Sequence, residues 1–209
     1  MIHVIDYGMG NIGSVLNALA AVGAEAKKTS DPAELVDAEA IVLPGVGAFG
    51  DGMSNLSKRG FVSALENEVL KKHKPFLGIC LGLQLLASKG LEHGSFDGLG
   101  WIPGTVDRLT IPTQEPGLRI PHIGWNDVTF LKKDGIYAEQ GDTQVYYFVH
   151  SYAFIPENPQ VISGTCFYGS EFAASIEMDN ISAVQFHPEK SHRAGLQLLK
   201  HWCSTRVRC

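Results

Sequence analysis

The chain of 209 residues lacks the sequence signals of several protein classes. Its 4 cysteines show no C-x-x-C spacing, and Cys166, Cys203 and Cys209 are interpreted as reduced, buried thiols. Basic residues occur in runs no longer than two, and the net charge of −5 argues against nucleic acid or an anionic membrane as a partner. The histidines lack metal-ligand spacing, so we expect no metal ion and no cofactor.

Long apolar runs are also missing, and none approaches the length that spans a membrane. The amino-terminal residues 1–6 lack the charged and apolar regions of a secretory signal, so we expect a cytoplasmic protein. With 44% hydrophobic residues and no linker or repeat, the chain favours a single domain over residues 1–209.

Short apolar segments alternate with helical periodicity in the first half of the chain. Apolar residues recur at helical spacing over residues 12–22, before Gly23, and over residues 56–70. Alternation of strand and helix predicts an α/β fold with three layers, in which helices flank a mostly parallel central sheet. The predicted strands of this half are residues 2–5, 25–28, 40–43 and 75–79.

The second half, from about Trp101, has the alternating pattern of antiparallel strands. Residues 164–168, 172–177 and 181–186 are predicted strands, with Asp179-Asn180 as a turn. An amphipathic helix follows, with Ser191 as its predicted N-cap. We therefore expect additional antiparallel strands beside the parallel sheet.

A nucleophile elbow is the most informative motif. The apolar strand at 75–79 runs into Gly78-Ile79-Cys80-Leu81-Gly82, which is the G-x-S-x-G pattern with sulfur in place of oxygen. The glycines allow a sharp turn, and side chains at their positions would collide with the neighbouring strand or helix. The following helix favours a thiolate at Cys80, and the Leu81 N–H is a candidate oxyanion donor. A buried structural cysteine is the alternative.

A histidine and a glutamate flank a proline further along the chain. In an extended segment His187 and Glu189 would point to the same side, so the carboxylate would orient the imidazole while its other nitrogen faces the sulfur. Taken alone, this stretch also fits a surface turn or a metal site. The apolar run before it and the elbow at Cys80 favour a catalytic pair.

A glycine-rich loop, Pro44 to Gly50, follows the predicted strand at 40–43. It lacks the Lys-Ser/Thr of a phosphate-binding loop, and a plain turn is one interpretation. Its place beyond the carboxyl end of a parallel strand suits a second oxyanion donor, because ligands of open parallel sheets bind there.

These motifs together resemble the class I, or triad, glutamine amidotransferases, which have a flavodoxin-like α/β fold. Within that class the sequence is similar to the glutaminase subunits of imidazole glycerol phosphate synthases. The similar segments are Asp6 to Asn11, Pro44 to Phe49, Gly78 to Gln84, Pro121 to Asn126, Tyr147 to Tyr152 and Gln185 to Ser191.

The resemblance implies that Cys80, His187 and Glu189 form a catalytic triad that hydrolyses glutamine to glutamate and ammonia through a γ-glutamyl thioester. It also implies an oxyanion hole and a pocket for the amino-acid end of glutamine. The implied oxyanion-hole residues are Leu81, Val46 and Gly47, and the implied substrate-binding residues are Gly45, Gln84, Ser151 and Tyr152.

The resemblance further implies a partner, a cyclase subunit that forms a heterodimer and receives the ammonia in histidine biosynthesis. Tyr7, Met9 and Asn11 would lie at its interface. The loop around Val46 would adopt its productive orientation when the partner carries its ligand. Two alternatives remain open: a glutaminase subunit of another synthase, of the aminodeoxychorismate or pyridoxal phosphate type, and a regulatory module without activity.

Overall fold

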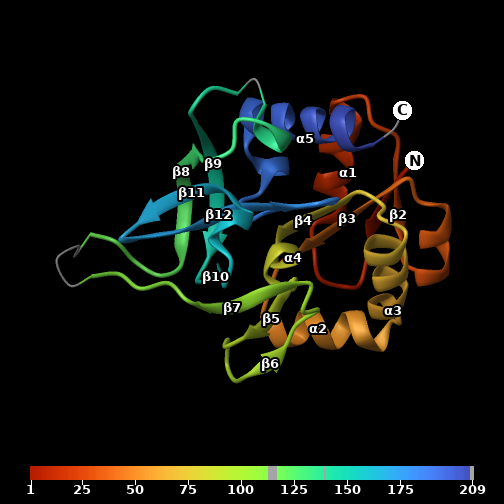
Figure 1. Cartoon of the computed structure of the whole chain (residues 1–209), viewed down its shortest axis with the longest axis horizontal. Helices are drawn as coiled ribbons and strands as arrows, with labels where there is room; N and C mark the ends of the chain where they lie inside the picture. Colours follow the sequence, from red (N-terminus) through yellow and green to blue (C-terminus); the bar gives the residue numbers. More distant parts are fainter. Residues whose placement is uncertain (113–116, 139, 208–209) are drawn as a thin grey trace.

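A nine-stranded mixed sheet runs through the computed structural model, which describes residues 1–112, 117–138 and 140–207 (Figure 1). Five neighbouring strands are parallel, and four antiparallel strands extend the sheet from β13. In spatial order the strands are β2 (Ala26–Thr29), β1 (Ile2–Ile5), β3 (Ala40–Gly45), β4 (Phe76–Cys80), β13 (Ile181–Val184), β12 (Ser170–Met178), β11 (Ile162–Tyr168), β8 (His122–Phe130) and β9 (Thr143–His150).

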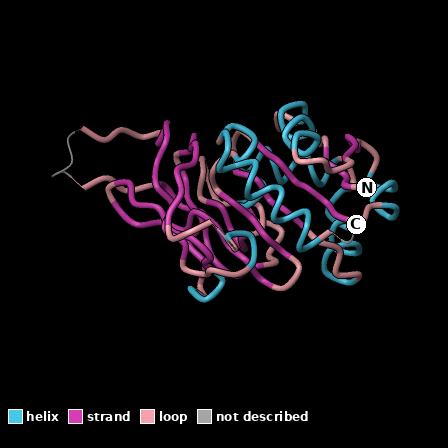
Figure 2. Tube along the Cα trace, turned by 90° about the horizontal axis from the view of Figure 1, so that it is seen from above, coloured by secondary structure: helices cyan, strands magenta, loops and turns pink. Residues whose placement is uncertain are grey.

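Helices cover both faces of the parallel half of the sheet, as the alternating sequence pattern predicts. One hydrophobic cluster joins the sheet to α1 (Ile12–Ala21) and α5 (His192–Arg206), and a second joins it to α2 (Phe49–Lys58) and α3 (Phe61–Leu65). Figure 2 shows the helices gathered around this half, with the antiparallel strands extending beyond them. The prediction of a three-layer α/β fold is confirmed.

A second, four-stranded sheet packs near the carboxyl end of β4 and was not predicted from the sequence. Its order is β10 (Tyr152–Pro156), β7 (Ile102–Arg108), β5 (Ala87–Gly90) and β6 (Phe96–Asp97). Strand β5 begins three residues after α4 (Leu81–Gln84), so the helix that follows the elbow is a single turn. The short connection brings the second sheet directly against the elbow.

The predicted helix over residues 56–70 is wrong in one respect, because the structure divides it. Gly60 has a φ of +75° and separates α2 from α3, which continues into a π-helical turn, η2 (Glu66–Lys71). The remaining short turns are η1 (Pro32–Asp37), η3 (Gly135–Tyr137), η4 (Pro159–Val161) and η5 (Pro188–Lys190). Among the described residues, none of the helices combines the length and apolarity that crossing a bilayer requires.

Two further predictions concern single side chains. Ser191 occupies the N-cap position of α5, but its hydroxyl donates to the His187 carbonyl at 2.6 Å instead of capping the helix. Cys166 and Cys203 are buried, as predicted, and Cys209 lies outside the described residues. The serine therefore fixes the segment that carries His187.

Candidate active site

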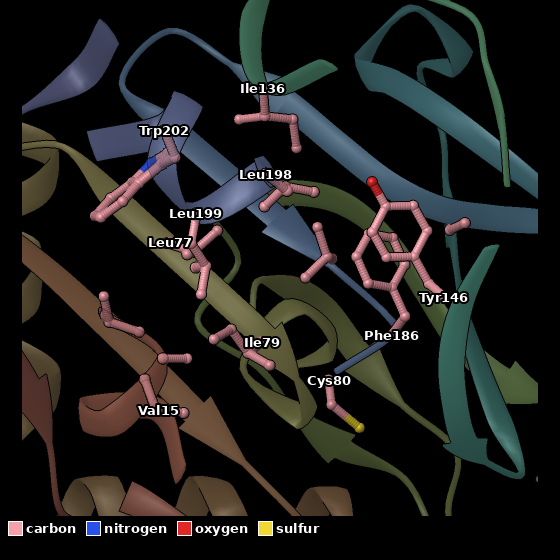
Figure 3. Packing of buried hydrophobic residues seen from close by; sticks show 14 of the residues in the cluster. Val15, Leu77, Ile79, Cys80, Ile136, Tyr146, Phe186, Leu198, Leu199 and Trp202 are labelled. Atoms are coloured by element: carbon pink, nitrogen blue, oxygen red, sulfur yellow. The ribbon is translucent and has the colours of Figure 1, made fainter. Parts of the chain in front are cut away.

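Cys80 stands in strained backbone geometry at the carboxyl end of β4. Its φ is +54°, a value that non-glycine residues rarely adopt, and its side chain is 6% exposed. Figure 3 shows its sulfur directed away from the core residues Ile79 and Phe186. A Cβ on Gly78 would lie 2.8 Å from the Gly82 carbonyl oxygen, and one on Gly82 would overlap the Leu43 carbonyl. The steric need for both elbow glycines is thus confirmed.

His187 and Glu189 form a buried pair beside the elbow. Nδ1 of His187 lies 2.8 Å from Oε1 of Glu189, and their side chains are 2% and 3% exposed. The extended geometry expected for this pair is wrong at Glu189, because Pro188–Lys190 is a 3-10 turn. The turn still places the Glu189 carboxylate against the His187 imidazole, so the expected contact forms with a different backbone conformation.

The protonation of His187 depends on its two neighbours. Burial alone lowers its pKa, but the hydrogen bonds and negative charges of Cys80 and Glu189 outweigh burial and raise the pKa to about 10. The other ring nitrogen, Nε2, is buried, and Cys80 is the neighbour on that side of the ring. This geometry favours a thiolate and imidazolium pair, with Glu189 holding the ring.

A pocket of about 190 Å³ opens at Cys80. Its wall comes from the glycine loop after β3, from α4, from the loop after β5, and from the segment that joins β9 to β10. The residues around it are Val46, Gly47, Cys80, Leu81, Gln84, Glu92, Val149, His150, Ser151 and Tyr152. Three of the four predicted substrate-binding residues and all three predicted oxyanion residues thus lie at one pocket.

Gly45 is the predicted substrate residue that does not line this pocket. It pairs with Cys80 across β3 and β4, and its missing side chain leaves room for the Tyr7 hydroxyl and for Leu81. Its position indicates close packing beneath the glycine loop. At Gly47, a Cβ would approach the Met9 Cε to 2.6 Å, so Met9 packs directly against that loop.

The predicted partner-interface residues differ in exposure. Tyr7 is fully buried, so the prediction that its side chain lies on a partner surface is wrong for this conformation. Burial, and after it the charge of Cys80, raise the pKa of Tyr7. Met9 is partly buried, and Asn11 is exposed and accepts the Ser14 N–H at the start of α1.

Glu92 and Gln185 are polar residues of the site that were not assigned a role from the sequence. Glu92 lines the pocket from the loop after β5, and its Oε2 accepts the Phe49 N–H at 2.8 Å. Gln185 is fully buried, and its amide nitrogen lies 3.7 Å from the Cys80 sulfur. No sequence motif identifies Glu92. Gln185 could have been identified, because it is a polar residue in an apolar segment and lies two residues before His187.

Comparison with known proteins agrees with this geometry. The family model described as glutamine amidotransferase class-I matches residues 3–203, and the chain belongs to that family. The chain is 48% identical over 203 residues to imidazole glycerol phosphate synthase subunit HisH of Geobacter sulfurreducens, covering 96% of this chain and 97% of the relative. It is 48% identical over 200 residues to the subunit of the same name from Aquifex aeolicus, covering 95% and 94%.

Within the class the chain therefore belongs with the HisH subunits of imidazole glycerol phosphate synthase, and it is a glutamine amidotransferase. Solved structures agree on the fold. PurLQS from Thermotoga maritima superimposes with a TM-score of 0.76 at 19% identity, covering 97% of each chain.

Proposed function

We propose that the chain hydrolyses glutamine at Cys80 and passes the ammonia to a cyclase subunit that makes imidazole glycerol phosphate and AICAR. The observation that carries the proposal is the buried set of Cys80, His187 and Glu189 beside a pocket of about 190 Å³. The names of the relatives, subunits of imidazole glycerol phosphate synthase, supply the pathway.

The reaction begins when the Cys80 sulfur attacks the side-chain amide carbon of glutamine. The carbonyl oxygen becomes an oxyanion, which the Leu81 N–H and an N–H of the Val46-Gly47 loop stabilise. Leu81 is the first residue of α4, so its N–H is not used within the helix.

The C–N bond then breaks as His187 gives its proton to the departing nitrogen, which leaves as ammonia. A thioester between Cys80 and the γ-carboxyl remains. His187, now neutral, takes a proton from water as the water attacks the thioester, and glutamate leaves while the thiolate and imidazolium are restored. Glu189 keeps the imidazole oriented through both steps.

The amino-acid end of glutamine would lie against Gln84, Glu92 and the segment at Ser151 and Tyr152. The amide nitrogen of Gln84 already donates to the Tyr152 carbonyl at 2.9 Å and to Gln185 at 3.0 Å. Gln84 therefore meets the substrate through its oxygen, as an acceptor for the α-ammonium group. The Glu92 carboxylate would supply the opposite charge for the same group.

The partner surface that we propose lies on β8 and β9. Ile123 and Trp125 are 59% and 47% exposed, and they pair across the strands with Val149 and Tyr147. Directly paired residues share one face of a sheet, and Val149 also lines the pocket. The exposed apolar stripe is thus continuous with the site where ammonia is released, as a subunit that receives ammonia requires.

Glutamine turnover without an acceptor would be wasteful, so we propose that the partner controls the loop around Val46. Met9 packs against Gly47, which gives a partner that contacts Met9 a direct route to the oxyanion loop. Glutamate release should rise when the cyclase and its nucleotide ligand are added. Equal turnover by the isolated chain and by the liganded complex would contradict this control.

We further propose that residues 1–209 act as one domain. The pocket takes residues from the loop after β3 in the large sheet and from β10 in the small one, so neither sheet contains the site alone. Limited proteolysis should therefore yield no active fragment. The cytoplasmic location stays a prediction.

The decisive experiment reconstitutes the complex with Cys80→Ala and, separately, with His187→Ala. Each variant should lose glutamine-dependent synthesis while synthesis from added ammonium salts survives, because the acceptor reaction takes place on the partner. Cys166→Ala is the matched control, since this buried cysteine lies between strands away from the pocket. Loss of both activities in the two catalytic variants would refute separate sites.

Labelling distinguishes an active enzyme from a silent module. A glutamine-analogue affinity reagent should modify Cys80 once per chain and leave Cys166 unmodified. Failure to modify Cys80 would favour the module. Co-purification with a different synthase would favour the other acceptor pathways.

A further inference from the structure

Gln185 is a buried polar residue that the proposed chemistry does not use. It follows β13 and precedes Phe186 and His187, and its side chain is fully buried. Its amide Nε2 lies 3.7 Å from the Cys80 sulfur, and its Oε1 accepts a hydrogen bond from Gln84 at 3.0 Å. Buried polar groups are normally hydrogen-bonded, so the role of the contact between the Gln185 amide and the reactive sulfur can be asked and tested.

The direction of these hydrogen bonds follows from a backbone carbonyl. The Tyr152 oxygen can only accept, so the Gln84 group 2.9 Å from it is the NH₂ group. That same NH₂ group faces Gln185, which must present its oxygen to Gln84. The NH₂ group of Gln185 consequently faces Cys80, as a donor to sulfur.

A pair of buried histidines contacts the same carbonyl from the other side. Nδ1 of His150 lies 2.9 Å from the Tyr152 oxygen and therefore carries a proton, which leaves its Nε2 to accept from Nδ1 of His122 at 3.0 Å. Burial lowers the pKa of His122 to about 4 and that of His150 to about 3, so both rings are neutral at pH 7. The Tyr152 oxygen therefore accepts hydrogen bonds from both His150 and Gln84, and this carbonyl sets the direction of the bonds that lead to Cys80.

We propose that Gln185 stabilises the Cys80 thiolate by donating an amide hydrogen bond to the sulfur, in addition to the imidazolium of His187. The proton of the thiol moves to Nε2 of His187, and Gln185 neither gains nor loses a proton. Because Gln185 is fully buried, a donor that already points at the anion costs no reorganisation during the reaction. The inference rests on the proposed role of Cys80 as nucleophile.

The competing interpretation is that Gln185 is purely structural and only holds Gln84 against β10. The two roles differ in what they do to the sulfur. A hydrogen-bond donor to the thiolate changes the pH at which Cys80 becomes reactive. Loss of a purely structural side chain changes the stability of the fold and substrate binding but leaves that pH unchanged.

The test measures the rate of Cys80 alkylation by iodoacetamide against pH, on the full chain, for wild type, Gln185→Met and Gln185→Glu. Methionine keeps the length of the side chain and removes the donor. Glutamate keeps the acceptor for Gln84 and replaces the donor with a negative charge. Gln140→Met is the matched control, because Gln140 is also buried and hydrogen-bonded, to Ile136 and Tyr146, on the side of α5.

We expect the midpoint of the alkylation profile to rise by about one pH unit in Gln185→Met, a tenfold loss of thiolate at a fixed pH below the midpoint. Gln185→Glu should raise it further, although it preserves the contact with Gln84. Gln140→Met should leave the midpoint unchanged. In the complex, kcat for glutamine should fall about tenfold in Gln185→Met at neutral pH.

A folded Gln185→Met variant with the midpoint of wild type would overturn the inference and leave the glutaminase assignment intact. If wild-type Cys80 resists alkylation at every pH, or if its alkylation leaves glutaminase activity unchanged, the proposed nucleophile itself is wrong. If Gln185→Met does not fold, the side-chain amide resonances of Gln185 in the wild-type chain replace it. Their chemical shifts should change with pH at the same midpoint as the alkylation rate, and they should not depend on pH in Cys80→Ala. Chemical shifts that do not depend on pH in wild type would overturn the inference.

Discussion

Gly78→Ala should damage the active site through the backbone alone. The new Cβ would lie 2.8 Å from the Gly82 carbonyl oxygen and 3.1 Å from the Ala183 Cβ, where ordinary contact begins at 3.4 Å. The turn at Gly82 must therefore retreat by about 0.6 Å. Leu81, the proposed oxyanion donor, is the preceding residue and moves with it.

Overpacking of this size costs roughly 1–3 kcal/mol of unfolding free energy. For a chain of this length each kcal/mol lowers Tm by roughly 2–4 °C, so the expected loss is roughly 2–12 °C. A misplacement of about 1 Å can reduce turnover by about a hundredfold, so we expect a loss of up to that size. Thermal unfolding and glutamate release in the complex measure the two effects, and ammonia-dependent synthesis should not change.

Gly13→Ala is the control for the change from glycine to alanine. Gly13 lies in α1, and no described atom would come within 4 Å of a Cβ added there. Its unfolding free energy should stay the same or rise by up to about 1 kcal/mol, because alanine favours helix. A Gly78→Ala variant with wild-type Tm and kcat/KM would refute the steric account of the elbow.

Two further predictions concern Gly47 in the glycine-rich loop and the pair of His187 and Glu189. Gly47→Ala should reduce glutamine-dependent kcat/KM more than about tenfold and spare ammonia-dependent synthesis, because φ is +114° and Met9 occupies the Cβ space; equal loss of both activities would contradict it. His187 has a folded pKa of about 10, above its ordinary 6.5, so the stability from its charge is fully present below pH 6.5 and is lost as pH rises through about 10. Glu189→Gln removes part of that stability. The difference in unfolding free energy between wild type and this variant, measured by urea unfolding, should therefore shrink between pH 6.5 and 10. A difference that stays constant over this range would count against the charged pair.

Local signals account for most of the fold that could be predicted from the sequence. The strands β3 and β4 are continuous apolar runs, β1 is apolar except at His3, and the elbow is marked by glycines at which an added Cβ would collide with backbone. The break between α2 and α3 was missed because apolar periodicity continues across Gly60. Periodicity records which face is buried, and it does not record a single residue with positive φ.

The candidate site was predictable where its members are close in sequence. His187 and Glu189 are two residues apart, and their contact needed no knowledge of the fold. Gln84 and Gln185 are 101 residues apart, so their contact depends on β4 and β13 being neighbours. Tyr7 follows β1, and its burial there is decided by packing against Gly45, which no local pattern of the sequence records.

The same packing bears on how much energy the proposed partner would have to supply to activate the enzyme. Suppose that the oxyanion loop is productive in about 1% of isolated chains. A preference of about 2.7 kcal/mol then makes the productive loop about half populated, which is roughly a fiftyfold activation, since each tenfold step in the equilibrium constant is about 1.36 kcal/mol. Met9 touches Gly47 directly, so a partner that holds Met9 acts on the loop without moving the sheet. One or two new contacts at Met9 supply energy of that order, and the buried Cys80, His187 and Glu189 can stay fixed while the loop alone changes.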